Sequence, residues 1–344
     1  MCVQWSSPVS AIGNASRRDF LKRCLSGAAV LRTGVAMELP AAAQRSVAPA
    51  KSKVVIARDD LLRGTGSTVD LRRMLDLLDR AMQTLFDRSH ATEAWGKLVR
   101  PGDKVGVKVN SLGGRGLSSN LQLVEAICER LQGAGIKAGD IVVWDHDSDE
   151  LERAGFHIVM GGNGVQCFGT DRVDYEQELV AYGSVGSRLS RILTQRCSVL
   201  INVPVLKDHD GAGVTIALKN MYGVIHNPNK YHPNGCNPYI ADLNMLPEIR
   251  TRMRLTICDA TTAQYEGGPA YKPEYSWNYN ALIVSQDPVA LDYTGWQIIE
   301  RKRAEKGLKT LEAEGRMPHY IATAADAEHR LGTNDPGRIT VAEV

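Results

Sequence analysis

Short runs of apolar, often β-branched residues alternate along this chain with segments whose apolar residues recur at helical spacing. The runs predict strands at 54–57, 105–109, 141–144, 199–205, 255–258 and 282–284. The other segments predict helices at 69–86, 121–131, 187–195, 240–249 and 288–303. Continuous apolar strands separated by helices indicate a largely parallel (mixed) central sheet with helices on both faces. We therefore expect an α/β fold with Rossmann-like layering.

Several predicted helices carry end signals. Thr68 is the expected N-cap of the first helix, because its hydroxyl can accept a backbone N–H of the first turn. Gly133 or Gly135 is expected to end the second helix. Asp287 before Pro288 predicts the N-cap of the last one. Asp292 comes five residues later, on a different helix face, so the two carboxylates are not expected to form a catalytic pair.

Polar and ionisable residues stand where four predicted strands end, which is where ligands bind in such sheets. They are Lys108 and Asn110, then Asp145, then Lys207, Asp208 and His209, and finally Asp259. For each one alone, a solvated loop is the better interpretation. The whole set favours one shared site at the edge of the sheet.

Residues 202–232 carry most of the candidate chemistry. Three of the eight histidines (His209, His226 and His232) and three lysines (Lys207, Lys219 and Lys230) fall within them. Lys207, His209 and Lys219 are the candidate catalytic residues. Lys108, Asn110 and Asn220 are the candidate anion-binding residues, because an ammonium group and amide donors recognise carboxylate or phosphate.

A metal ion is one further expectation for this site. His209, His232, Asp145 and Asp259 are the candidate ligands, since imidazole and carboxylate suit zinc, iron or manganese. No H-x-x-x-H or H-E-x-x-H spacing occurs, so these ligands would come from separate loops. The alternatives are that the histidines are neutral hydrogen-bond partners, or that they transfer protons without a metal.

The cysteines give no cofactor signature. Beyond residue 43 the chain has Cys128, Cys167, Cys197, Cys236 and Cys258, without a C-x-x-C pair or a ferredoxin-type run, so it contains no iron–sulfur motif. A single disulfide remains open, with no preferred pairing. Cys236 lies in a Gly/Asn/Pro loop beside the candidate site.

The N-terminal segment has the features of an export signal. Residues 16–22 read S-R-R-D-F-L-K, the form of a twin-arginine signal, and a weakly apolar segment (24–37) and the small residues after Pro40 follow. We expect a signal peptide at 1–43, a linker at 44–52 and one α/β domain at 53–344. The Tat export machinery would then be a partner, and the mature protein periplasmic and free of the membrane. An uncleaved anchor and a surface helix are the alternatives.

Charge argues against nucleic acid as a partner. The chain has 41 basic and 39 acidic residues. Residues 1–43 contain five basic and two acidic ones, so removing them changes the net charge from +2 to −1. No basic field remains to hold a phosphate backbone.

A series of motifs in fixed order resembles one known family. The series is N-V-P-V-L-K-D-H (202–209), A-L-K-N-M-Y-G-V-I-H (217–226), His232, I-A-D-L (240–243), Asp259, E-G-G-P (266–269) and S-Q-D-P-V-A-L-D (285–292). Over roughly residues 53–300 the chain resembles the family called domain of unknown function (DUF) 362. Some relatives carry an appended ferredoxin-like domain with cysteine clusters, which this chain lacks. The resemblance implies no particular reaction, because none is established for the family as a whole.

The residues lead to one preferred hypothesis and two alternatives. The preferred one is an exported enzyme that uses a metal or an inserted cofactor on a small anionic substrate in a Lys/His/Asp pocket. A non-catalytic periplasmic protein that binds an anion or a metal is the first alternative. An accessory protein whose groove receives a partner is the second.

Overall fold

The computed structural model describes residues 51–344. The predicted signal peptide (1–43) and most of the predicted linker (44–52) lie outside the described residues. The described residues lie within one compact unit. None of the helices between residues 51 and 344 has the length and apolar character that a membrane span requires.

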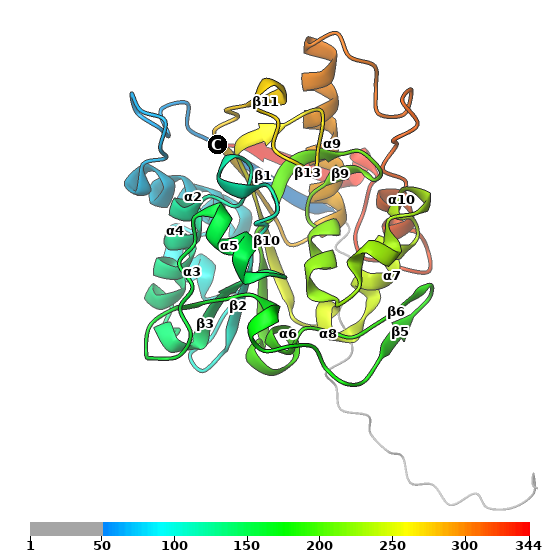
Figure 1. The fold of residues 1–344 in the computed structure, drawn as a ribbon. Coiled ribbons are helices and arrows are strands. Elements are labelled where there is room, and N and C mark those ends of the chain that lie inside the picture. Colours follow the sequence, from blue (N-terminus) through cyan, green and yellow to red (C-terminus); the bar gives the residue numbers. More distant parts are fainter. Residues whose placement is uncertain (1–50) are drawn as a thin grey trace, which may run out of the picture. The chain divides into compact units, whose positions relative to one another are not determined.

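The centre of this unit is a mixed, mostly parallel sheet (Figure 1). Its main path runs β13-β1-β12-β10-β7-β2-β3-β4, and every neighbouring pair is parallel except those that involve β12. The bounds are β1 Ser52–Arg58, β2 Val105–Lys108, β3 Ile141–Trp144, β4 Gln166–Cys167, β7 Val199–Asn202, β10 Met253–Gln264, β12 Ala281–Ser285 and β13 Ile339–Glu343. The predicted fold class is confirmed.

Shorter strands extend this framework. β8 (Val205–His209) pairs with β10 and forms a hairpin with β9 (Gly213–Thr215). β11 (Ser276–Trp277) pairs with the end of β10. β5 (Val180–Tyr182) and β6 (Val185–Ser187) form a separate two-stranded sheet.

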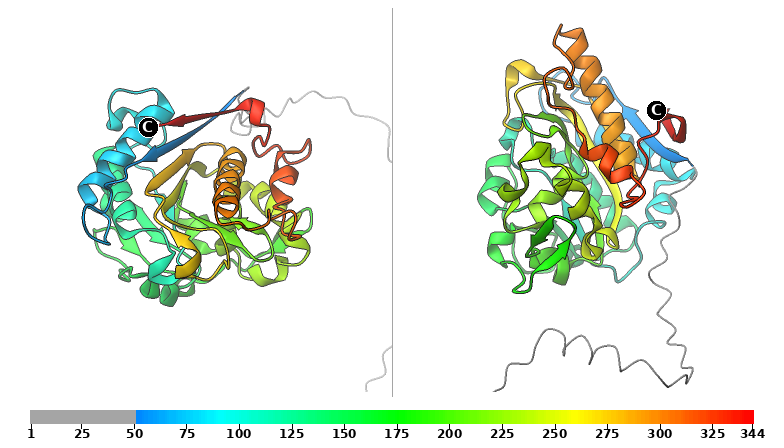
Figure 2. Two further views of the ribbon diagram at one scale, coloured as in Figure 1. Left: turned by 90° about the horizontal axis from the view of Figure 1, so that it is seen from above. Right: turned by 90° about the vertical axis from the view of Figure 1, so that its right-hand side faces the viewer.

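Helices cover both faces of the sheet (Figures 1 and 2). One face carries α2 (Leu71–Phe86), α3 (Ala91–Trp95), α4 (Leu121–Gly133) and α5 (Ser148–Ala154). The other carries α6 (Arg191–Arg196), α7 (Tyr239–Met245), α8 (Pro247–Arg250), α9 (Pro288–Glu305) and α10 (Tyr320–Ala325). Alternate residues of the strands supply the two cores: Val55 belongs to the first, and Val54 and Ile56 belong to the second.

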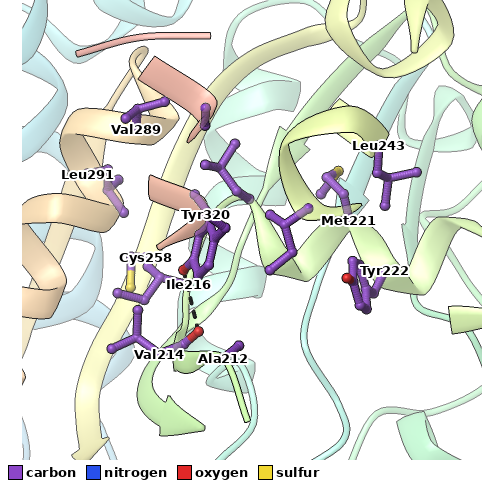
Figure 3. Packing of buried hydrophobic residues seen from close by; sticks show 14 of the residues in the cluster. Ala212, Val214, Ile216, Met221, Tyr222, Leu243, Cys258, Val289, Leu291 and Tyr320 are labelled. Carbon is purple, nitrogen blue, oxygen red and sulfur yellow. Dashed lines mark hydrogen bonds between the residues drawn. The ribbon is translucent and has the colours of Figure 1, made fainter. Parts of the chain in front are cut away.

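The second core holds the segment that carries most candidate site residues. Val214, Ile216 and Met221 pack with residues of α7, α9 and α10 (Figure 3). Tyr320 of α10 is buried there, and its hydroxyl donates to the carbonyl of Val214 over 3.4 Å. The turn from β9 into the following 3₁₀ helix is therefore fixed by buried apolar contacts.

Two predicted elements are each divided in the structure, and a proline stands at each break. The predicted strand 199–205 is two strands, because Pro204 between β7 and β8 has no N–H for the ladder. The predicted helix 240–249 is likewise two helices, α7 and α8, and Pro247 begins the second. The break after β7 lets β8 continue along β10 and deliver Lys207 to the site.

Helix starts were predicted less well than strands. The N-cap of α2 is Asp70, whose carboxylate accepts the N–H of Arg73 over 2.9 Å, so the choice of Thr68 was wrong. The helix predicted at 187–195 begins only at Arg191, after the strand β6. The N-cap role of Asp287 on α9 is confirmed by two backbone donors, Val289 and Ala290.

Candidate functional site

The first part of the candidate site is a buried ion pair at the ends of two adjacent strands. Parallel pairing of β2 with β3 places Lys108 beside Trp144, and the Nζ of Lys108 lies 2.6 Å from Oδ1 of Asp145. Oδ2 of Asp145 accepts the N–H and the hydroxyl of Ser111, each over 2.8 Å. Burial opposes ionisation of Asp145, but Lys108 and Ser111 outweigh it and hold its pKa below the ordinary value. The charge of Lys108 is thus compensated within the protein.

A glycine makes room for this pair. Gly223 lies in the 3₁₀ helix η4 (Lys219–Val224). A Cβ atom at this position would lie 2.7 Å from Nζ of Lys108 and 2.8 Å from Oδ1 of Asp145. Only glycine therefore lets η4 pack directly on the ion pair without displacing it.

Three asparagines form a hydrogen-bond network that includes Lys207. Oδ1 of Asn110 accepts from Nζ of Lys207 over 3.0 Å, and Nδ2 of Asn110 donates to Oδ1 of Asn220 over 3.1 Å. Nδ2 of Asn220 donates in turn to Oδ1 of Asn202 over 2.8 Å. Residues from β7, β8, η4 and the loop after β2 thus share one network. Asn202 was missed, although a polar residue inside the apolar run V-L-I-N-V was a usable signal.

Lys207 is a buried cation that lacks a carboxylate partner. Its side chain is 0% exposed, and Asn110 is its hydrogen-bond partner within residues 51–344. An ammonium group has three donors, so a neutral amide satisfies only part of its capacity. Burial lowers the pKa of Lys207 to about 8. Thr215, its partner in the β8–β9 hairpin, has a buried hydroxyl with no hydrogen-bond partner in the described chain.

Lys219 is the second such cation. It begins η4, and its Nζ lies 3.2 Å from Nε2 of His232 and 4.3 Å from the ring centroid of Tyr222. Both partners are neutral groups, and the aromatic face adds a cation–π contact. Burial lowers the pKa of Lys219. Two ammonium groups in this site therefore depend on uncharged neighbours.

The two histidines of the site stack on each other. The ring centroids of His209 and His232 are 5.7 Å apart with an interplanar angle of 23°. Backbone N–H groups of residues 211 and 212 donate to Nδ1 of His209 over 3.0 and 3.2 Å. Burial, followed by the charge of Lys219, lowers the pKa of His209 to about 2, and the same two causes lower that of His232. Both rings are neutral at pH 7. Nδ1 of His209 therefore acts as an acceptor, even though the exposed Asp210 carboxylate lies 2.9 Å from it.

Asp259 is held by partners other than the site lysines. Its carboxylate accepts the N–H groups of Asn120 over 2.6 Å and of Thr261 over 2.8 Å, and Arg63 is the cation that acts on it. These donors are thus backbone groups, and neither Lys207 nor Lys219 is among them. Residues 51–344 also contain no group of three or more His, Cys, Asp or Glu side chains placed to hold a metal ion. The four candidate metal ligands therefore do not form one centre.

Asp208 turns away from Lys207 into an ionic cluster of its own. Its carboxylate accepts from Nη1 of Arg316 over 3.1 Å and from the N–H of Gly268 over 2.9 Å. Arg316 also pairs with Glu266, which is hydrogen-bonded to the fully buried Arg303. This arginine cluster, whose members are Asp208, Glu266, Arg303, Glu314 and Arg316, attaches the 266–269 turn to β8.

Asp292 positions the start of η4, a role that the sequence alone did not suggest. It is fully buried on α9, and its carboxylate accepts the N–H groups of Ala217 over 2.6 Å and Leu218 over 3.2 Å. Burial raises its pKa to about 7. The residue acts on the site by fixing the backbone immediately before Lys219.

The loop with Cys236 supports His232. The thiol of Cys236 donates to the carbonyl of His232 over 3.7 Å, and burial raises its pKa, so it remains a thiol. All five cysteines within residues 51–344 are free and buried. His226 is not part of the cluster, since its Nδ1 accepts the N–H of Arg188 over 3.2 Å.

The fold and the site together define an α/β protein with a mostly parallel sheet and a buried, cation-rich cluster at its edge. The family model described as "Domain of unknown function (DUF362)" matches residues 105–297, more than half of the 344 residues. The chain belongs to this family, and the matched region contains every residue of the candidate site.

Two other comparisons add less. A comparison with curated protein sequences gives no match. A crystal structure of a Thermotoga maritima protein, a structural genomics target, is similar with a TM-score of 0.36 and 9% identity. The likeness covers 71% of this chain and 60% of that one.

Proposed function

We propose that the protein is an enzyme that binds a small carboxylate or phosphate anion between Lys207 and Lys219. The observation that carries this proposal is the pair of buried ammonium groups whose hydrogen-bond partners in the described chain are neutral. An uncompensated buried charge costs several kcal/mol. A bound anion offsets that cost and supplies acceptors for the unused donors, and for it the Thr215 hydroxyl is a further donor.

The same groups support proton transfer. An amine with a pKa of about 8 is close to neutrality, where a general acid or base is most effective. Nε2 of neutral His232 is within hydrogen-bond distance of Lys219, so a proton can pass between them. A protein that only binds an anion needs fixed donors and no such perturbed amine. This is why catalysis is preferred over simple anion binding.

Binding of inorganic phosphate and of acetate, measured by isothermal titration calorimetry, tests the anion site. We expect the wild-type protein to bind at least one of them, and Lys207→Met or Lys219→Met to weaken that binding by about tenfold or more, because each removes a charge-assisted hydrogen bond. Lys97→Met is the control, since Lys97 is exposed and remote from the site in sequence. Equal affinity in all four proteins would contradict the proposal.

We also propose that the protein is exported to the periplasm by the twin-arginine route. The support is the sequence S-R-R-D-F-L-K at 16–22 with the apolar segment and small residues that follow it. Changing Arg17 and Arg18 together to lysine should retain the full-length protein in the cytoplasm. Cell fractionation followed by immunoblotting measures this, and an unchanged periplasmic fraction would refute the route.

A further inference from the structure

A separate cavity of about 790 Å³ opens at the edge of the sheet and is lined by residues other than those of the lysine site. Five segments line it: residues 63–69 before α2, 115–122 after β2, 154–157 at the end of α5, 261–262 of β10, and 271–278 around β11. These elements can be followed in Figure 1. Its volume is that of sites for small organic ligands, about 300–1,000 Å³, and it is large for a simple inorganic anion.

The lining of the cavity is basic. Arg63, Arg115 and His157 contribute to it, and no Asp or Glu does. Nη1 of Arg63 donates to Oδ1 of Asn280 over 3.0 Å, and Nη2 donates to the hydroxyl of Thr262 over 2.8 Å. These hydrogen-bond partners are neutral. The charge of Arg63 also acts on the buried carboxylate of Asp259, which is hydrogen-bonded to the N–H groups of Asn120 and Thr261 rather than to the guanidinium group. Neither arginine forms a salt bridge within residues 51–344, and the exposed Arg115 can turn its guanidinium group to an anionic ligand.

The beginning of α4 adds to this preference for an anion. Asn120, Leu121 and Gln122 line the cavity, and Asn120 is the N-cap of this thirteen-residue helix. The positive end of a helix stabilises a phosphate or carboxylate group. Ser118, another lining residue, has a buried hydroxyl with no partner in the described chain. An unused donor thus stands beside the helix end and the two arginines.

The other walls of the cavity offer hydroxyl groups and aromatic rings. Thr261 and Ser276 line it together with Tyr271 and Trp277. The Tyr271 ring lies directly against Gly116, where an added Cβ would be 2.1 Å from the ring. Short polar side chains pair with the hydroxyls of a sugar, and aromatic faces pack against its ring. The cavity thus combines an anion-binding end with walls that suit a polyhydroxylated ring.

We propose that this cavity binds the phosphate monoester of a sugar, either free or as part of a nucleotide. Arg63, Arg115 and the start of α4 hold the phosphate, and Tyr271 and Trp277 contact the rest of the ligand. The site is additional to the lysine site and touches it through one residue. Ser119 lines the cavity, and its hydroxyl accepts the N–H of Asn110, the partner of Lys207, over 2.8 Å.

Calorimetric titration with ribose 5-phosphate and with AMP tests the proposal. We expect the wild-type protein to bind at least one of them, and Arg115→Ala to weaken binding by about tenfold or more through loss of charge-assisted hydrogen bonds. Arg115 is exposed, so its replacement should leave the fold intact. Tyr271→Ala should weaken binding less, and Arg72→Ala, an exposed arginine outside the lining, is the matched control. Similar affinities for both probes assign recognition to the sugar phosphate, and tighter binding of AMP assigns it to a nucleotide.

Lys207→Met separates this proposal from the preceding one. Sugar phosphate binding should persist in that variant, because Lys207 does not line the cavity. Binding that disappears in Lys207→Met but persists in Arg115→Ala would place the ligand at the lysine site and overturn the second site. Absence of binding to both probes would also overturn it, without affecting the phosphate and acetate test of the lysine site.

Discussion

Two clusters of buried cations in this protein are compensated in opposite ways. Arg303 and Lys207 are both 0% exposed. Arg303 pairs with Glu266 and Glu314 and also donates to the carbonyl groups of Tyr265 and Lys309. Lys207 has a neutral amide as its partner in the described chain. The difference shows that burial of a cation alone does not mark a functional site.

Compensation is what separates the two roles. In the arginine cluster both arginines pair with carboxylates, and their guanidinium donors are used within the protein. The cluster therefore needs no ligand to balance its charges. In the lysine site, Lys207 and Lys219 have neutral hydrogen-bond partners and form no ion pair within the described chain. The first cluster should therefore matter mainly for stability, and the second mainly for binding.

The largest expected effect comes from removing Arg303. Arg303→Met should lower the free energy of unfolding by about 3–5 kcal/mol, because it leaves two carbonyl groups without their donor and Glu266 and Glu314 with Arg316 alone as their cation. Urea unfolding followed by circular dichroism measures the change. Arg301→Met, at an exposed position of the same helix, is the control. A loss below about 1 kcal/mol would erase the proposed contrast between the clusters.

Lys207→Met should change the free energy of unfolding less than Arg303→Met does, and at pH 7.5 it should not destabilise the protein. The folded-state pKa of Lys207, about 8, lies below the value of about 10.4 in an unfolded chain. Between these values the unfolded chain binds more protons, so the contribution of Lys207 to stability rises with pH through this window. In the absence of an anion, the free energy of unfolding of the wild-type protein should rise by about 1–2 kcal/mol, relative to that of Lys207→Met, between pH 7.5 and pH 9.5.

Unfolding both proteins at the two pH values isolates this contribution, because the other titrating groups are common to them. At pH 7.5 Lys207→Met should be about as stable as wild type or slightly more stable, since it removes an uncompensated charge. A pH-independent difference, or a loss as large as that of Arg303→Met, would show that Lys207 belongs to the fold as Arg303 does.

The strands and the set of polar groups at their ends were predictable from sequence. Apolar runs located β2, β3 and β7, and parallel pairing then brought Lys108 to Asp145. Lys207 meets Asn110 because Asn110 follows β2 and β8 continues beyond the end of β7, the neighbour of β2. Local pattern was sufficient here, since the alternation of strands and helices fixes which strand ends share an edge.

Other features could not be predicted from local sequence patterns. Asp208 and Asp259 also stand near strand ends, but one turns to Arg316 and the other to Asn120. Successive side chains of a strand point to opposite faces, so a register or a bulge decides which group enters the site. The role of Asp292 depends on α9 packing beside residues 217–218, a contact between positions about 75 residues apart.

By itself, the sequence determined the α/β class, the family and the concentration of lysine and histidine in residues 202–232. Hydrophobic periodicity and sequence motifs are local, so they can be recognised without knowledge of the packing. Only the tertiary structure decided which buried cations meet carboxylates, and it alone revealed the basic cavity beside α4. Charge compensation depends on distances between segments far apart in the chain, and packing alone sets those distances.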